Sequence, residues 1–128
     1  MSYYIAKETP LGFDAAVARV TETLKSEGFG VLTDIDVQAT LRAKIGAELP
    51  KYRILGACNP KIAYAALQAE NKVGVLLPCN VIVREAGGGR VEIAAIDPVS
   101  SMERTGNPAL QAHADDVRAR LKRAVEGV

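Results

Sequence analysis

Apolar and polar positions repeat along the chain with two different periods, which separate strands from helices. Alternation with a period of two predicts a strand over residues 2–8. Short apolar runs bounded by Gly, Pro or Asn predict four more strands, over residues 29–35, 52–57, 79–86 and 90–97. Gly87-Gly88-Gly89 separates the last two runs and predicts a hairpin.

A period near 3.6 residues predicts two long amphipathic helices. The first ends at Gly28, and its apolar stripe is Phe13, Ala16, Val17, Val20 and Leu24. The last opens after Gly106, and its apolar stripe is Leu110, Ala114, Val117, Leu121 and Ala124. Both helices are long enough to cover a sheet.

Two shorter helices are predicted from their first residues. Asp36 is a suitable N-cap for a helix over residues 37–46, with Leu41 and Ile45 as its inner stripe. Asn59-Pro60 predicts an alanine-rich helix, because Asn caps well and Pro at the first helical position loses no needed donor.

The resulting order is β-α-β-(α)-β-(α)-β-β-α. We expect an α+β fold with a single, mostly antiparallel sheet and the two main helices on one of its faces. No repeat or linker divides the sequence, so residues 1–128 are expected to form one domain.

Charge argues against two classes of partner. The chain has 16 basic and 15 acidic residues, which leaves a net charge of +1. Nucleic acids and anionic membranes are bound by strongly basic surfaces, so neither is expected as a partner. No apolar run approaches the roughly 20 residues of a membrane-spanning helix.

The compartment is inferred from the first residues and from the cysteines. The first eight residues contain no basic segment followed by an apolar core, so no signal peptide is expected. Two cysteines without such a leader predict a cytoplasmic protein with free thiols.

Cys58 is the first candidate for chemistry. It lies one residue before the predicted N-cap Asn59, close to the unpaired N–H groups and the positive end of a helix dipole. That environment favours a thiolate, which can act as a nucleophile or a soft-metal ligand. The alternative is a small buried residue at the end of a strand.

Cys79 begins a predicted strand and shares its face with Val81 and Val83, so it is expected to point toward the core. If the third and fourth strands are antiparallel, Cys58 and Cys79 lie together at one sheet edge. Two neighbouring thiols can form a reversible disulfide or supply two ligands to copper or zinc. A structural zinc site needs four ligands, so the pair alone would be incomplete.

Further polar candidates are few. His113, the single histidine, is expected to be a solvated residue of the last helix, beside its apolar stripe. Asp34 and Asp36 share one strand face and could act together as acid and base. The simpler interpretation is that Asp36 caps the following helix while Asp34 faces solvent.

Three sequence blocks resemble the bacterial and archaeal family called domain of unknown function 302. They span residues 28–37, Tyr52 to Pro60, and 76–81, in that order. The resemblance implies a small α+β fold similar to that of the TATA-box-binding protein, and a dimer. The family's motif cysteines match Cys58 and Cys79, and its motif aspartate matches Asp36. The resemblance implies no established reaction, so no catalytic residue is assigned.

Three hypotheses for function remain open. The first is a cytoplasmic homodimer with a ligand, soft-metal or thiol redox site formed by Cys58, Cys79, Asn59 and Asp36. The second is a non-catalytic module that binds an apolar small molecule between sheet and helices. The third is a purely structural dimer. An exposed sheet edge motivates the dimer, with Tyr3 and Tyr4 as interface aromatics.

Overall fold

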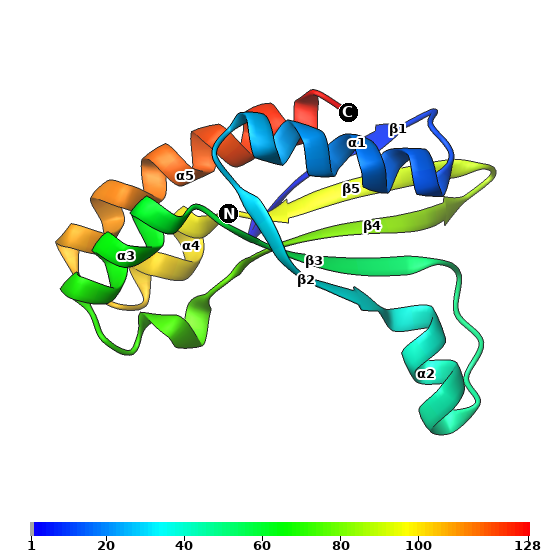
Figure 1. Cartoon of the computed structure of the whole chain (residues 1–128), viewed down its shortest axis with the longest axis horizontal. Helices are drawn as coiled ribbons and strands as arrows, with labels where there is room; N and C mark the ends of the chain where they lie inside the picture. Colours follow the sequence, from blue (N-terminus) through cyan, green and yellow to red (C-terminus); the bar gives the residue numbers. More distant parts are fainter. Residues whose placement is uncertain (1) are drawn as a thin grey trace.

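The computed structural model describes residues 2–128, and every predicted strand is present. The strands are β1 (Tyr4–Thr9), β2 (Gly30–Asp36), β3 (Tyr52–Cys58), β4 (Cys79–Gly87) and β5 (Arg90–Ile96). The helices are α1 (Phe13–Ser26), α2 (Val37–Ile45), α3 (Pro60–Ala69), the 3₁₀ helix η1 (Val73–Leu76), α4 (Pro98–Glu103) and α5 (Pro108–Glu126). Figure 1 shows their arrangement.

The five strands form one sheet in the order β1-β5-β4-β3-β2, and every neighbouring pair is antiparallel. Strands β2 to β5 therefore form a meander, and β1 adds to it beside β5. Gly87 and Gly89 have positive φ in the turn between β4 and β5, which confirms the predicted hairpin. The fold is α+β, as the sequence predicted.

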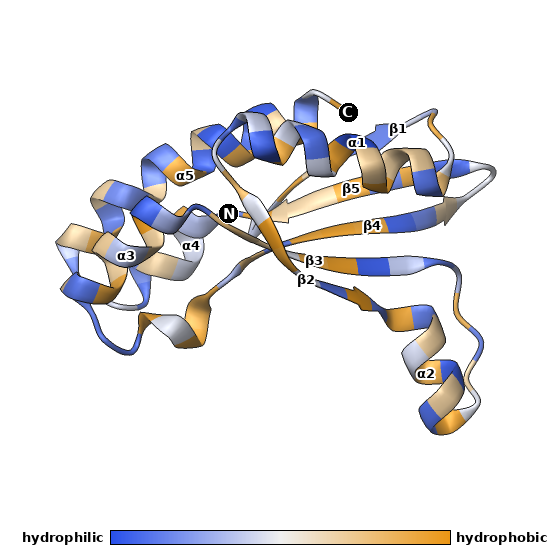
Figure 2. Cartoon of the chain, in the orientation of Figure 1, coloured by the Kyte–Doolittle hydropathy of each residue, from blue (hydrophilic) through white to orange (hydrophobic). Residues whose placement is uncertain are grey.

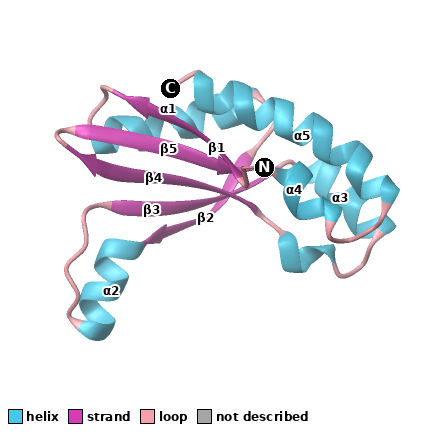
Figure 3. Ribbon diagram, turned by 180° about the vertical axis from the view of Figure 1, so that it is seen from behind, coloured by secondary structure: helices cyan, strands magenta, loops and turns pink. Residues whose placement is uncertain are grey.

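Helices α1 and α5 cover one face of the sheet, which confirms the predicted layering (Figures 1 and 3). Hydrophobic residues alternate with hydrophilic ones along both helices (Figure 2). The predicted stripes supply Val20, Leu24 and Leu121, which pack against strand residues such as Val83 and Ile93, all of them fully buried. This layer is the main core.

A second, smaller core lies beyond one end of the sheet. It consists of buried residues from α3, η1, α4 and α5, namely Ala66, Val73, Met102, Leu110 and Ala114. Since α5 is 19 residues long, it contributes to both cores. The two cores meet at a seam along α5.

Helix α2 departs from the prediction. It forms where expected, and the Asp36 carboxylate accepts a hydrogen bond from the backbone N–H of Ala39 at 2.9 Å. Its expected inner stripe is wrong, because no residue of α2 is buried and Ile45 is 73% exposed. The physical reason is visible in Figure 1, where α2 projects away from the sheet instead of packing on it.

Helix α4 was not predicted. Its N-cap is Asp97, whose carboxylate accepts a hydrogen bond from Val99, and Pro98 occupies the first turn. Asp97 also accepts an ion-paired hydrogen bond from Arg118 of α5 at 3.0 Å. Asp97-Pro98 is the same kind of start signal as Asn59-Pro60, but the strand predicted over residues 90–97 includes Asp97 as its last residue.

Candidate functional site

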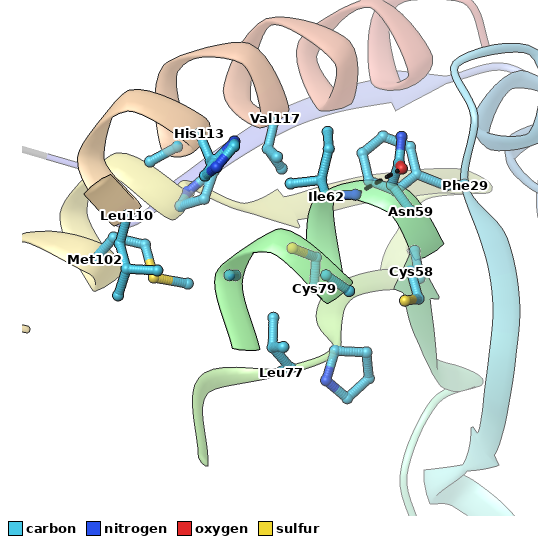
Figure 4. Close-up of a pocket in the computed structure, with 16 residues that line it drawn as sticks. Phe29, Cys58, Asn59, Ile62, Leu77, Cys79, Met102, Leu110, His113 and Val117 are labelled. Atoms are coloured by element: carbon cyan, nitrogen blue, oxygen red, sulfur yellow. Dashed lines mark hydrogen bonds between the residues drawn. The ribbon is translucent and has the colours of Figure 1, made fainter. Parts of the chain in front are cut away.

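A cavity of about 50 Å³ lies where the end of β3 and the start of β4 meet α3, α4 and α5 (Figure 4). Its walls come from both cores: Phe29, Ala57 and Val117 belong to or border the main core, and Met102 and Leu110 belong to the second. The cavity therefore occupies the seam between two separately packed regions.

The start of α3 forms one wall of the cavity. The Asn59 side-chain oxygen accepts a hydrogen bond from the backbone N–H of Ile62 at 3.3 Å, and Pro60 follows in the first helical turn. This confirms the predicted N-cap. Gly28, with a φ of 87°, lies against the Asn59 amide: a Cβ at Gly28 would stand 2.9 Å from Nδ2. The end of α1 thus fixes the cap of α3.

Both cysteines line this cavity, one at the end of β3 and the other at the start of β4. The ladder pairs Ala57 with Cys79, so Cys58 lies one residue beyond the partner of Cys79. The two strands are antiparallel, as the sequence argument required. They are inner strands of the sheet, so the cysteines lie at an end of the sheet and not on an edge strand.

The two thiols nevertheless point in different directions. Alternation along β3 puts Cys58 on the face of Ile54 and Gly56, whereas Cys79 follows Val81 and Val83 toward the helices. The sulfur atoms point to different sides in Figure 4. Both cysteines are free and half-buried. The arrangement brings two thiols to one cavity without aligning them for a disulfide.

Cys79 is held as a neutral thiol. Burial, followed by the nearby charge that Cys58 would carry as a thiolate, raises the pKa of Cys79 from 9.0 to about 11. Desolvation disfavours the charged form of a thiol, which follows from the predicted position of Cys79 on the core-facing side of the strand with Val81 and Val83. Near neutral pH, Cys79 is therefore a weak hydrogen-bond donor on an apolar wall.

His113 also lines the cavity, contrary to the expectation of a solvated residue. It is half-buried and lies one turn from both Leu110 and Val117 along α5. Spacings of three and four residues place side chains on one helix face, so the sequence contained the signal. The predicted apolar stripe runs through Ala114, and a polar residue next to such a stripe is expected to face solvent.

Asp36 lies apart from the cysteines. The β2–β3 ladder pairs Gly30 with Cys58 at one end and Asp36 with Arg53 at the other. The Asp36 carboxylate caps α2, and Asp34 forms an ion pair with Arg53 at 3.2 Å. Of the four candidate residues, the structure brings together Cys58, Asn59 and Cys79 and places Asp36 at the far end of the strands.

Two further properties bear on the kind of site. Within residues 2–128, no group of three or more His, Cys, Asp or Glu residues is arranged to hold a metal ion. A soft metal bound by Cys58 or Cys79 would need ligands from elsewhere. The same residues contain no helix that is both long and apolar enough to cross a membrane.

Comparison with known proteins gives a family and a fold. The model of the family described as "Domain of unknown function DUF302" matches residues 5–128. The chain is also similar to the crystal structure of an uncharacterized conserved DUF302 protein from Bacillus stearothermophilus. The identity is 30%, the TM-score is 0.91, and 98% of each chain is covered. None of the curated proteins compared with the chain is significantly similar to it.

Proposed function

The chain belongs to the DUF302 family, and from the geometry of its cavity we propose that it binds a small, mostly apolar ligand between α3, α4, α5 and the sheet. The observation that carries this proposal is the composition of the wall. Apolar side chains make up most of it, and four side chains with polar atoms, those of Cys58, Asn59, Cys79 and His113, are also part of it. Binding sites for small molecules have this composition.

The size of the cavity limits the ligand. An apolar cavity of about 150 Å³ accepts benzene or xenon, and the present cavity measures about 50 Å³. It therefore accepts one small apolar group, and the rest of a larger ligand would extend out of the cavity. Met102, a flexible side chain on the wall, can change rotamer to enlarge it.

The polar groups would orient the ligand. Within residues 2–128 the His113 ring makes no hydrogen bond to another side chain, so it can donate to or accept from a ligand. The Cys79 thiol can donate weakly, since burial keeps it protonated. The Asn59 side chain is held by its bond to Ile62 and adds a fixed dipole at the helix start.

Thiol redox chemistry or soft-metal binding is a second candidate function. The β3–β4 register favours it, because Ala57 pairs with Cys79 and Cys58 is the residue that follows Ala57. Two observations place it behind ligand binding. The thiols point to different sides, and the raised pKa of Cys79 opposes the thiolate that both chemistries require. A metal ion bound to Cys79 would have to displace the proton of its thiol.

The proposal includes a homodimer in the cytoplasm. Two free thiols in a chain of this size are typical of a reducing compartment. The exposed aromatic residues Tyr3 (74%) and Tyr4 (47%) favour self-association. Light scattering at micromolar concentration should give twice the mass of one chain, and a single-chain mass would contradict the dimer.

Xenon tests the cavity directly, because it enters small apolar cavities without specific chemistry. Xenon under pressure should shift the amide NMR signals of Ala57, Cys79 and Ala114. Ala63→Leu, which adds volume to the wall, should abolish these shifts. Ala65→Leu, on the same helix but outside the wall, should retain them.

Native mass spectrometry of the purified protein adds a second readout, since a co-purified ligand would appear as added mass lost on denaturation. Absence of xenon shifts in the wild-type protein would contradict an accessible apolar cavity. Equal shifts in the Ala63→Leu variant would place the binding elsewhere.

A further inference from the structure

The face of the sheet opposite α1 and α5 carries a continuous apolar row. Ile35 pairs with Ile54, Ile54 with Ile82, Ile82 with Ala94, and Ala94 with Ala6. Cross-strand partners point to the same face, so this row crosses all five strands. None of its members is fully buried, and Ile35 is 47% exposed.

This face is hollowed and uncovered. The hollow measures about 660 Å³, and its lining consists of strand residues together with Tyr3. No helix residue contributes to that lining. Tyr3 and Tyr4 pack edge to face, with ring centroids 5.0 Å apart, at the rim. An exposed hollow with an apolar centre and aromatic residues at its edge has the features of a protein interface.

The charges on this face are arranged in pairs. The next row across the strands contains Arg84 and Glu92, whose side chains meet at 2.8 Å. Glu8, the β1 partner of Glu92, forms an ion pair with Arg90 at 3.4 Å. The face therefore carries two positive and two negative charges. A two-fold axis that runs parallel to the strands, midway between β4 and β5, would place β4 of one chain over β5 of the other. Arg84 of each chain would then face Glu92 of the other, so the surface is self-complementary.

We infer that this open face binds a second copy of the same chain, with the Ile54–Ile82–Ala94 segment of the row at the centre of the interface. The inference rests on the homodimer proposed above and specifies its surface. It differs from pairing along an exposed strand edge, because the contacts are made by the face. Tyr3 and Tyr4 then act as rim residues, next to the hollow of the partner. The ligand cavity remains outside this surface, since it lies where the end of the sheet meets α3, α4 and α5 and shares no lining residue with the hollow.

A charged residue in the centre of the row tests the inference. Ile82→Lys should weaken the dimer about thirtyfold or more, as expected for a central interface residue. Val75→Lys is the matched control, because Val75 is 86% exposed on η1 and lies outside the face. Sedimentation velocity over a range of concentrations gives the dissociation constants, and circular dichroism confirms folding of each variant.

An exchange of the charges at Arg84 and Glu92 tests the same interface if Ile82→Lys fails to fold. Arg84→Glu should weaken the dimer, and the double variant Arg84→Glu/Glu92→Arg should restore it, because the exchange preserves self-complementarity. Recovery in the double variant supports the inference.

Each contrary result has a separate meaning. A wild-type protein that stays monomeric overturns both the dimer and its surface, but leaves the ligand proposal intact. A dimer that is unaffected by Ile82→Lys and by Arg84→Glu overturns the surface alone. Binding of a different protein or of nucleic acid to this face, with the wild type monomeric, also overturns it.

Discussion

The two faces of the sheet are formed by alternate residues of the same strands, yet only one face is covered by the chain's own helices. On β4, Val81 and Val83 are fully buried beneath α1 and α5, whereas Ile82 between them is half-buried on the open side. Cys79 and Cys58 likewise lie on the covered and the open face, although both are half-buried. Hydrophobicity alone therefore does not distinguish a core residue from a residue of the open face; the helices decide which face is the core.

The largest expected effect compares one isoleucine from each face. Ile93→Ala should reduce the free energy of unfolding by about 2–5 kcal/mol, because Ile93 is fully buried and its loss leaves a cavity. Ile82→Ala should cost about 1 kcal/mol at protein concentrations where the chain is monomeric. Urea denaturation measures both values. Equal losses would show that the open face is packed in the single chain.

The next effect is the pH dependence contributed by Cys79. Below pH 9 the thiol is protonated in both the folded and the unfolded chain and adds no pH dependence. Between pH 9.0 and about 11 the unfolded chain loses this proton first, so the stability falls as pH rises. The fall should amount to about 2–3 kcal/mol.

Urea denaturation at several pH values would measure this loss of stability as the difference between the free energies of unfolding of the wild type and of Cys79→Ala. The Cys58→Ser variant is the control and should retain most of the fall. A wild-type profile that parallels that of Cys79→Ala would show that Cys79 titrates as it does in the unfolded chain.

The smallest effect is a difference in reactivity between the two thiols. Near neutral pH, iodoacetamide should modify Cys58 about tenfold faster than Cys79, since the raised pKa of Cys79 leaves little thiolate. Asn59→Ala should slow the reaction at Cys58 by weakening the start of α3, and should cost about 1 kcal/mol of stability. Peptide mapping by mass spectrometry quantifies both sites. Faster modification of Cys79 would contradict the assignment of faces.

Local patterns were sufficient to predict most of the fold. The alternation of β4 and the stripes of α1 and α5 depend on period alone, and the caps Asp36 and Asn59 depend on short-range hydrogen bonds. Ile45 shows the limit of such patterns. Its spacing from Leu41 is that of an inner stripe, but a stripe is buried only where another element covers it, and no element covers α2 closely enough to bury any of its residues.

The candidate site was predictable in part, because local patterns predict the strands that carry its cysteines. Antiparallel neighbours bring Cys58 and Cys79 together, and a strand-by-strand argument reaches that result. The cavity also requires α4 and α5 to lie beside α3, and no short-range signal specifies that packing. Met102 therefore appears in the site only when the helices are placed in space, whereas the spacing of His113 from Leu110 and Val117 already puts it on the inner face of α5.

The strand order has a consequence for how the chain folds. Strands β2 to β5 form a meander in which each strand pairs with its neighbour in sequence, whereas β1 pairs with β5, the most distant strand along the chain. Thr9 and Val91 lie about 80 residues apart, compared with about 20 for the β3–β4 connection, so closure of the β1–β5 ladder costs about 1 kcal/mol more in chain entropy. The first strand to be synthesised therefore completes its hydrogen bonds only after the fifth has been made.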